Sequence, residues 1–255
     1  MKTLFLGLAA AATLSTAPAL AADMPVKARP VVEAAYNWSG LYTASTVGIG
    51  WARERGDFVF PPPDRHNSNH SSAWYDSHIG FQWQFSNIVI GVEGAWATPL
   101  DKTYGSSTSP SADCFGATPI ANRLCESRVS NVWSAGGKLG LAFDRRMVYG
   151  IGGWASAKIA TRDRVASTGV INVAEDRDYR HNGWFAGVGG EWFVGKILFS
   201  DVIFGLEYRH YSFESVRHFP VNVVVPGVFA ADQRDVRATL DVVSAKLTFK
   251  WTPGG

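Results

Sequence analysis

From residue 37 onward the chain divides into segments of about ten to fourteen residues in which apolar and polar positions alternate. The connectors between these segments alternate between long and short. The long ones span about 52–72, 99–128, 161–181 and 214–237, and the short ones are Ser86-Asn87, Asp144-Arg145-Arg146 and Val194–Asp201. Four long and three short connectors imply eight strands, and this alternation is typical of barrels with short periplasmic turns and long outer loops. The sequence therefore predicts an all-β fold, an eight-stranded antiparallel up-and-down transmembrane β-barrel.

The two ends of the chain lack this alternation. Residues 1–21 combine Lys2, an apolar run from Leu4 to Leu14 and the small-residue site Ala19-Leu20-Ala21, which predicts a signal peptide. The run is shorter than the roughly 20 residues that a membrane helix needs. We expect a disordered periplasmic lead over 22–36, the barrel over 37–251 and a short tail over 252–255. An exported chain that crosses lipid with strands must close into a barrel, which predicts the cell outer membrane.

Composition agrees with a membrane barrel and names no partner. The chain has 10 Trp, 8 Tyr and 15 Phe, and only 18% of its residues are charged. Its net charge of +2 and the lack of a basic block argue against nucleic acid as a partner.

The alternation also predicts which side chains face lipid. The predicted outward set contains Leu41, Val47, Ile49, Trp51, Tyr75, Ile79, Phe81, Trp83, Phe85, Ile88, Ile90, Val92, Trp96, Trp133, Ala135, Leu139, Leu141, Phe143, Met147, Tyr149, Ile151, Trp184, Ala186, Val188, Trp192, Val202, Phe204, Leu206, Tyr208, Val243, Ala245, Leu247, Phe249 and Trp251. Over 147–158 the phase is blurred by Gly150, Gly152 and Gly153.

The opposite phase predicts a charged interior. Inward positions hold Glu93, Glu191 and Glu207 against Lys138, Arg209, Lys246 and Lys250, with Gln82 and Gln84 among them. An eight-stranded barrel is only wide enough for side chains to fill it. We therefore expect these groups to form a lumen charge network that plugs the barrel, with a narrow or gated pore for small solutes as the alternative.

Both cysteines, Cys114 and Cys125, lie in the second long connector. Exported proteins mature in an oxidising compartment, so we predict a disulfide between them within a surface loop. A metal site would need further ligands nearby, and a redox role would favour a spacing such as C-x-x-C.

Several short motifs together resemble one family. Asn37-Trp38-Ser39-Gly40-Leu41-Tyr42, Gly91-Val92-Glu93-Gly94, Gly205-Leu206-Glu207-Tyr208-Arg209 and a closing aromatic strand resemble the outer membrane immunogenic protein, or small porin-like, family of alphaproteobacteria. The resemblance implies an OmpA-like barrel, surface exposure, and roles in envelope integrity, host or symbiont contact, or haem binding in some relatives. Such proteins usually end on an aromatic residue that the barrel assembly machinery recognises, whereas here Trp251 is followed by Thr252-Pro253-Gly254-Gly255.

Two local patterns suggest chemistry. His210 and Ser212, followed by Glu214, resemble the His-x-Ser pair of lipid A deacylases, in which His activates Ser and a carboxylate orients His. The Asn expected after Ser is Phe213, and a histidine at headgroup level is ordinary in an interfacial girdle. Asp64, His66 and His70 could bind a metal or haem, although solvated loop residues are the simpler interpretation.

No nucleotide-binding glycine fingerprint, G-x-S-x-G or H-E-x-x-H motif is present. The sequence therefore predicts a non-enzymatic barrel without a cofactor or bound metal. Its expected partners are outer membrane lipids, lipopolysaccharide, the assembly machinery and a host or surface ligand. Arg162–Arg164, Arg177 and Arg180 could contact lipopolysaccharide phosphates, but interleaved acids make chance charge an equal alternative.

Overall fold

The structure is a computed structural model that describes residues 36–58, 65–102, 104–106, 123–165, 169, 177–218 and 234–251. The predicted signal peptide, the predicted lead up to residue 35 and the predicted tail lie outside these ranges. No helix in the described part of the chain is long and apolar enough to cross a bilayer.

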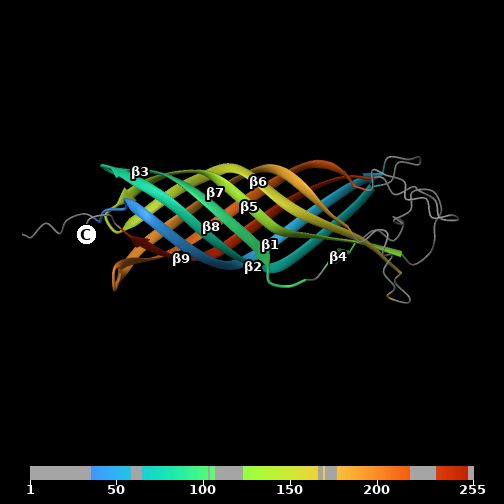
Figure 1. The fold of residues 1–255 in the computed structure, drawn as a ribbon, viewed down its shortest axis with the longest axis horizontal. Helices are drawn as coiled ribbons and strands as arrows, with labels where there is room; N and C mark the ends of the chain where they lie inside the picture. The colour runs from blue at the N-terminus through green and yellow to red at the C-terminus, as the bar shows by residue number, and fades with distance from the viewer. Residues whose placement is uncertain are drawn as a thin grey trace, which may run out of the picture. The chain divides into compact units, whose positions relative to one another are not determined.

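Eight long strands form one closed antiparallel ring (Figure 1). They are β1 (Gly40–Phe58), β2 (Arg65–Phe85), β3 (Ile88–Pro99), β5 (Arg123–Phe143), β6 (Arg146–Val165), β7 (Arg177–Ile197), β8 (Ser200–His218) and β9 (Arg234–Trp251). The two-residue β4 (Gly105–Ser106) pairs with the outer part of β5. Pairing of β3 with β5 and of β1 with β9 closes the ring, while residues 65–73 of β2 extend past β3, which pairs only with Trp74–Phe85. The predicted eight-stranded antiparallel up-and-down barrel is confirmed.

Two-residue turns connect the strands at one end of the barrel, here called the turn end. They are Ser86-Asn87, Asp144-Arg145 and Leu198-Phe199, and the first residue of each has a positive φ, between 54° and 57°. Residues 36–39 and the last residue of β9 also lie at this end. The other end, here called the loop end, carries the longer connections.

The strands extend further toward the loop end than the alternation indicated. β1 continues to Phe58 and β2 begins at Arg65, so most of the predicted connector 52–72 is strand. The other three long connectors are likewise shortened by β5, β6, β7, β8 and β9. The predicted boundaries were wrong because the outward residues here are polar, as at Arg53 and Asn69, while backbone pairing continues regardless of hydropathy.

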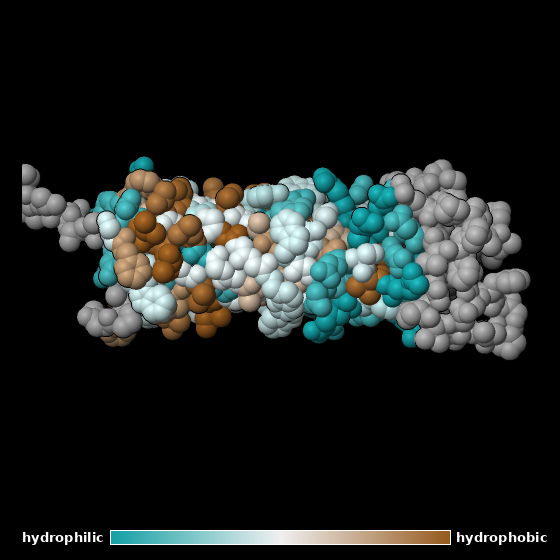
Figure 2. Space-filling model, turned by 90° about the horizontal axis from the view of Figure 1, so that it is seen from above, coloured by the Kyte–Doolittle hydropathy of each residue, from teal (hydrophilic) through white to brown (hydrophobic). Residues whose placement is uncertain are grey.

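The outer surface carries an apolar belt over the part of the barrel nearer the turn end (Figure 2). Val92 and Leu139 are each 61% exposed, and Trp83 is 53% exposed. On the loop-end side, outward aromatic residues border the belt: Trp51, Tyr75, Trp96, Trp133, Trp154, Trp184 and Tyr208. Soluble monomers rarely expose so much contiguous apolar surface, whereas a membrane barrel has an apolar band flanked by aromatic girdles.

The predicted phases are correct in seven strands and wrong in β6. Met147, Tyr149 and Ile151 were expected to face lipid, but each is at most 5% exposed and faces the interior. Val148 and Trp154 face outward instead, at 54% and 51% exposure. Both outward positions between them, 150 and 152, are glycine, so the lipid face of β6 carried only a weak hydrophobic signal, whereas Met147, Tyr149 and Ile151 pack inside.

Candidate functional site in the barrel interior

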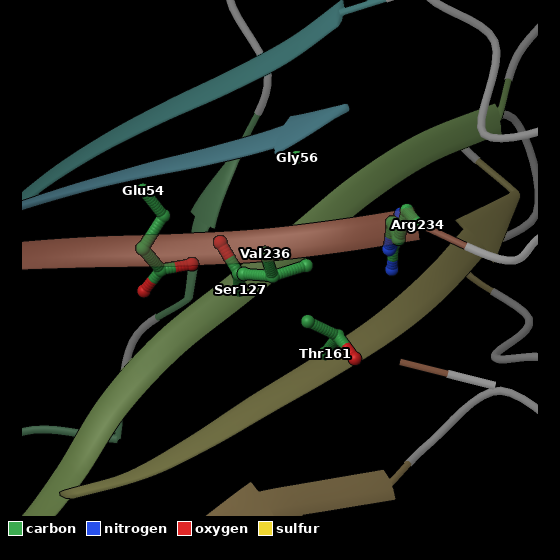
Figure 3. Close-up of a pocket in the computed structure, with 6 residues that line it drawn as sticks. All are labelled: Glu54, Gly56, Ser127, Thr161, Arg234 and Val236. Atoms are coloured by element: carbon green, nitrogen blue, oxygen red, sulfur yellow. The ribbon is translucent and has the colours of Figure 1, made fainter. Parts of the chain in front are cut away.

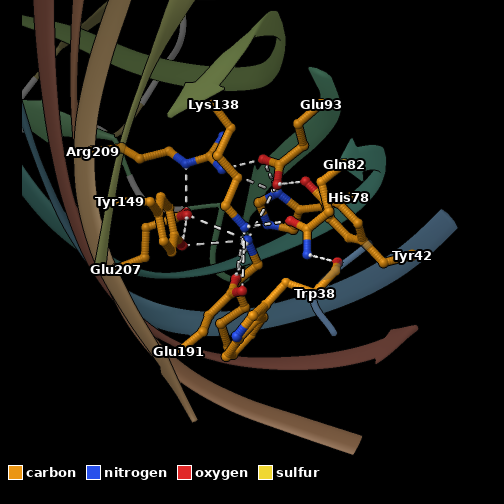
Figure 4. Close-up of polar contacts among 11 residues, drawn as sticks. Trp38, Tyr42, His78, Gln82, Glu93, Lys138, Tyr149, Glu191, Glu207 and Arg209 are labelled. Carbon is orange, nitrogen blue, oxygen red and sulfur yellow. Dashed lines mark hydrogen bonds and ion pairs between the residues drawn. The ribbon is translucent and has the colours of Figure 1, made fainter. Parts of the chain in front are cut away.

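Three acids and three bases meet in the middle of the barrel (Figure 4). Glu93 comes from β3, Lys138 from β5, Glu191 from β7, Glu207 and Arg209 from β8, and Lys246 from β9. Each occupies an inward position of a two-residue alternation, so strands distant in sequence deliver them to one level. None of the six is more than 5% exposed. We call these six residues the central network.

Lys246 lies among all three acids of the central network. Its Nζ is 3.2 Å from Glu93 Oε2, 3.3 Å from Glu191 Oε1 and 3.4 Å from Glu207 Oε2. A lysine ammonium has three protons to donate, and three carboxylates surround it here. Lys246 therefore ties β9 to β3, β7 and β8 through one charged group.

The other two cations each contact more than one partner. Arg209 Nη2 donates to Glu93 and Arg209 Nε donates to Glu207 Oε1 at 2.5 Å. Lys138 Nζ donates to Glu191 Oε2 at 3.2 Å and to Gln82 Oε1 at 3.1 Å. Every charge in the central network therefore has an opposite charge in contact.

Two tyrosines flank the network on opposite sides. Tyr42 donates its hydroxyl hydrogen to Glu93 at 2.9 Å, and Tyr149 donates to Glu207 at 2.6 Å. The Lys138 ammonium lies 4.1 Å from the centre of the Tyr149 ring, within cation–π range. Glycines make room for both rings: a Cβ at Gly80 would overlap the phenol of Tyr42, and one at Gly189 would overlap that of Tyr149.

Residues just before β1 close the interior below the network at the turn end. Trp38 is fully buried and its Nε1 donates to the Asp144 carbonyl at 3.1 Å. Gln82 Nε2 donates to the Trp38 carbonyl at 2.7 Å. Tyr36 stacks on Phe193, with ring centroids 4.2 Å apart. Tyr36 was assigned to the predicted lead, but it packs against the barrel.

Lys250 belongs to this lower layer rather than to the central network. Its Nζ contacts Asp201 Oδ2 at 3.2 Å and donates to the Asn37 carbonyl at 2.5 Å. Asp201 also accepts a hydrogen bond from Tyr36 Oη at 2.7 Å. The sequence grouped Lys250 with the other inward charges because alternation gives the direction of a side chain and not its height in the barrel. Gln84, the other inward amide, donates to the Ser86 carbonyl.

A small cavity lies inside the barrel, on the loop-end side of the aromatic border (Figure 3). It encloses about 10 Å³, space for about one water molecule, and is lined by Glu54, Gly56, Ser127, Thr161, Arg234 and Val236. Burial raises the pKa of Glu54 to about 7, and the Ser127 hydroxyl and the Arg234 charge offset this only in part. This acid was not singled out from the sequence, because it falls within a predicted connector.

A pair of buried histidines lies close to this cavity. His181 Nε2 and His218 Nε2 are 2.8 Å apart, and Thr161 Oγ1 is 3.2 Å from His218 Nδ1. The carbonyl of Glu214 must accept from His181 Nδ1, so His218 Nε2 donates to His181 Nε2 and the Thr161 hydroxyl donates to His218 Nδ1. Burial, Arg234 and His181 lower the pKa of His218 to about 2, which keeps the ring neutral.

The candidate catalytic residues lie on the outer wall, in β8. His210 and Ser212 face outward and are partly exposed. The expected carboxylate partner was wrong: Glu214 makes no side-chain contact with His210, and it lies in β8 rather than in a loop. Instead His210 Nδ1 is 2.7 Å from Asp241 Oδ1 on β9.

The remaining candidate ligands do not converge. Asp64 lies outside the described residues, while His66 and His70 belong to β2 rather than to a loop. His70 Nε2 is 3.6 Å from Asp101 Oδ1. Within the described residues no three His, Cys, Asp or Glu side chains gather closely enough to hold a metal ion.

The predicted basic loop is part of two strands, and the predicted disulfide is not tested by the structure. Arg162–Arg164 lie in β6, and Arg177 and Arg180 in β7, so these arginines belong to strands. Arg162 pairs with Glu126 at 2.6 Å and stacks on Tyr104. Cys114 and the side chain of Cys125 lie outside the described part of the chain, so the disulfide stays a prediction.

Comparison with known proteins gives only distant structural likenesses. No family model matches the chain, and no curated protein matches it. The solved structures similar to it include Ail, the attachment invasion locus protein of Yersinia pestis, at 11% identity and a TM-score of 0.34 over 83% of this chain and 99% of that one. Neisserial surface protein A has 13% identity and a TM-score of 0.33 over 84% of this chain and 98% of that one. OprG of Pseudomonas aeruginosa has 7% identity and a TM-score of 0.44 over 85% of this chain and 98% of that one.

Proposed function

We propose that this chain is a porin-like protein of the cell outer membrane whose lumen is plugged by its central network, and that it acts in envelope integrity and surface interaction. The apolar belt with its aromatic border supports placement in a bilayer. The family proposed is the small porin-like, outer membrane immunogenic family that the sequence motifs resemble.

The proposal of a plugged lumen rests on the burial of the central network. Side chains lining a water-filled pore are exposed to solvent, but the six charged groups are at most 5% exposed, and each contacts an opposite charge within the network. Trp38 and the Lys250–Asp201 pair add a second closed layer at the turn end. Opening a path would require separating buried ion pairs, and a buried charge left without its partner costs about 3–5 kcal/mol.

Strand length supports a role at the cell surface. Crossing the hydrocarbon region takes roughly 9–11 residues of a tilted strand, whereas β1, β2, β5, β6, β7 and β8 have 19–21 residues. The excess lies beyond the aromatic border toward the loop end, where outward residues such as Arg53 and Arg237 are charged. We propose that this loop-end part of the strands faces the outside of the cell, where it meets lipopolysaccharide and host or surface ligands.

Single-channel recording of the refolded mature protein in a planar bilayer tests the plug. The wild type is expected to be silent. A Glu93→Ala/Lys246→Ala double variant, which removes two central side chains, is expected to give openings and shows that the assay can detect a pore. Arg217→Ala, which removes an exposed pair with Asp235, serves as the matched control and is expected to stay silent. Steady openings of the wild type would instead establish the alternative, a narrow pore for small solutes.

A further inference from the structure

The outer wall of the barrel carries a histidine–aspartate dyad beside a serine, at the level of the aromatic border. His210 and Ser212 lie on β8, and Asp241 lies directly opposite His210 on β9. All three residues face away from the lumen and are neither fully buried nor fully exposed. None of them contributes to the central network, so the plug does not account for them.

The hydrogen bonds fix the role of each nitrogen of His210. The Asp241 carboxylate can only accept, so His210 Nδ1, at 2.7 Å, carries the shared hydrogen. In the neutral form of the ring, the free lone pair is then on Nε2. Tyr208 also donates to Asp241 Oδ1 at 2.7 Å, which holds the carboxylate in place. A carboxylate that orients an imidazole in this tautomer is the arrangement that makes histidine a general base.

Ser212 is placed to use that base. It lies two residues from His210 on the same strand, so both side chains leave the same face about 7 Å apart. The structure shows no hydrogen bond between these two side chains, and catalytic hydrogen bonds are often long without substrate and tighten only when substrate binds. Thr239, opposite Ser212 on β9, brings a second hydroxyl to the same face.

The surroundings of the dyad indicate the kind of substrate. Trp184 lies opposite Ser212 on β7, and its ring centroid is 5.5 Å from that of His210. Trp184 is 53% exposed, and Leu206, four residues before His210 on β8 and nearer the turn end, is 52% exposed. The site therefore lies between the apolar belt and the polar loop-end surface. This is the level at which the acyl esters of membrane lipids meet water.

We propose that His210, Ser212 and Asp241 form a lipid-facing hydrolytic site for acyl esters of outer-leaflet lipids. The inference rests on the proposed outer membrane placement and adds an activity to it, contrary to the non-enzymatic expectation from the sequence. Ser212 Oγ bonds to the ester carbonyl carbon while its proton passes to His210 Nε2, and His210 returns that proton to the departing alcohol oxygen. Water then attacks the acyl-serine, releasing a fatty acid and restoring Ser212.

Mass spectrometry of fatty acids released by the refolded mature protein tests the site. One arm supplies lipopolysaccharide and the other phosphatidylethanolamine, each in mixed detergent micelles. Release in either arm supports the proposal, and the productive arm identifies the lipid. Ser212→Ala is expected to abolish release, and Asp241→Asn to slow it by at least about 100-fold. Glu214→Gln, an exposed acid on the same strand, is the control and is expected to leave release unchanged.

Labelling with a long-chain fluorophosphonate gives a second readout that a structural role would not produce. The expected result is one adduct on Ser212 that requires His210, since His210→Asn leaves the serine without a base. Fatty-acid release that persists in Ser212→Ala, or a wild type that neither releases fatty acid nor forms the adduct, would overturn the proposal. Altered migration of unheated samples on gels shows that each variant is folded, which separates loss of the site from failure of the barrel.

Discussion

At the residue scale, burial separates two glutamates of β8 that look alike in the sequence. Glu207 is 3% exposed and contacts Arg209, Lys246 and Tyr149, whereas the Glu214 side chain is exposed. Glu207→Ala is expected to lower the free energy of unfolding by about 3–5 kcal/mol, because it leaves buried cations unpaired. Glu214→Ala is expected to change it by roughly 0–1 kcal/mol. Urea unfolding in detergent measures both, and an equal loss in the two variants would contradict the interior placement of Glu207.

A second residue-scale prediction concerns pH. The pKa of Glu54 is raised to about 7 from its ordinary value of 4.5, so the folded protein keeps a proton that the unfolded chain releases between these values. The contribution of protonated Glu54 to stability is therefore complete below pH 4.5 and is lost as the pH rises toward 7. Glu54→Gln, which cannot ionise, is expected to be about 3 kcal/mol more stable than wild type at pH 8 and nearly equal to it at pH 4.

The measurement for Glu54 is the urea midpoint in detergent at both pH values. Glu214→Gln is the matched control, because its exposed carboxylate should give no pH-dependent difference from wild type. A Glu54→Gln variant that gains nothing at pH 8 would show that Glu54 ionises freely in the folded protein.

At the scale of the strands, the pairing of β6 with β7 decides where small residues are required. Gly189 faces the interior, and a Cβ there would overlap the Tyr149 ring, whereas a Cβ on outward Gly150 would have no atom closer than 3.9 Å. Gly189→Ala is expected to destabilise the barrel by about 1–3 kcal/mol through overpacking. Gly150→Ala is expected to be neutral or slightly stabilising. The same unfolding assay compares them, and the reverse order would restore the outward phase that the sequence suggested for Tyr149.

This strand also shows where sequence reasoning succeeds and fails. In β2 the alternation of outward Ile79 with inward His78 was clear, and the phase followed from it. In β6 glycines occupy the lipid side, so apolar Met147 and Ile151 were assigned to lipid although they pack inside. The contact between His210 and Asp241 was missed for a different reason. It joins two strands through their register, and no local pattern marks Asp241 as the partner.

At the scale of the whole molecule, the charges of the central network were predicted but their grouping was not. Alternation placed Glu93, Lys138 and Lys246 inward, and the structure buries them. The alternation could not separate Lys250 from the central network, although Lys250 lies nearer the turn end with Asp201. Heights within a barrel depend on strand tilt and stagger, which arise only when the ring closes.

Closure also predicts how the intact protein behaves on a gel. A closed ring of paired strands resists local unfolding, so the unboiled mature protein in detergent is expected to migrate differently from the boiled form and to fractionate with the outer membrane. Identical migration together with soluble or inner-membrane fractionation would contradict the proposed placement.

The Cys114→Ser/Cys125→Ser double variant is expected to retain the shift in migration, since the predicted disulfide lies in a surface loop.

The meeting of the first strand with the last constrains the order of events during biogenesis. Lys250 on β9 donates to the carbonyl of Ser39, just before β1, across 211 residues of sequence. Contacts of such high sequence separation form slowly, because the chain entropy of the intervening loop is lost before the contact forms. The ring cannot close until the final strand has been synthesised and exported. Until then β1 offers an unpaired edge, so the chain depends on being kept apart from its neighbours during transit.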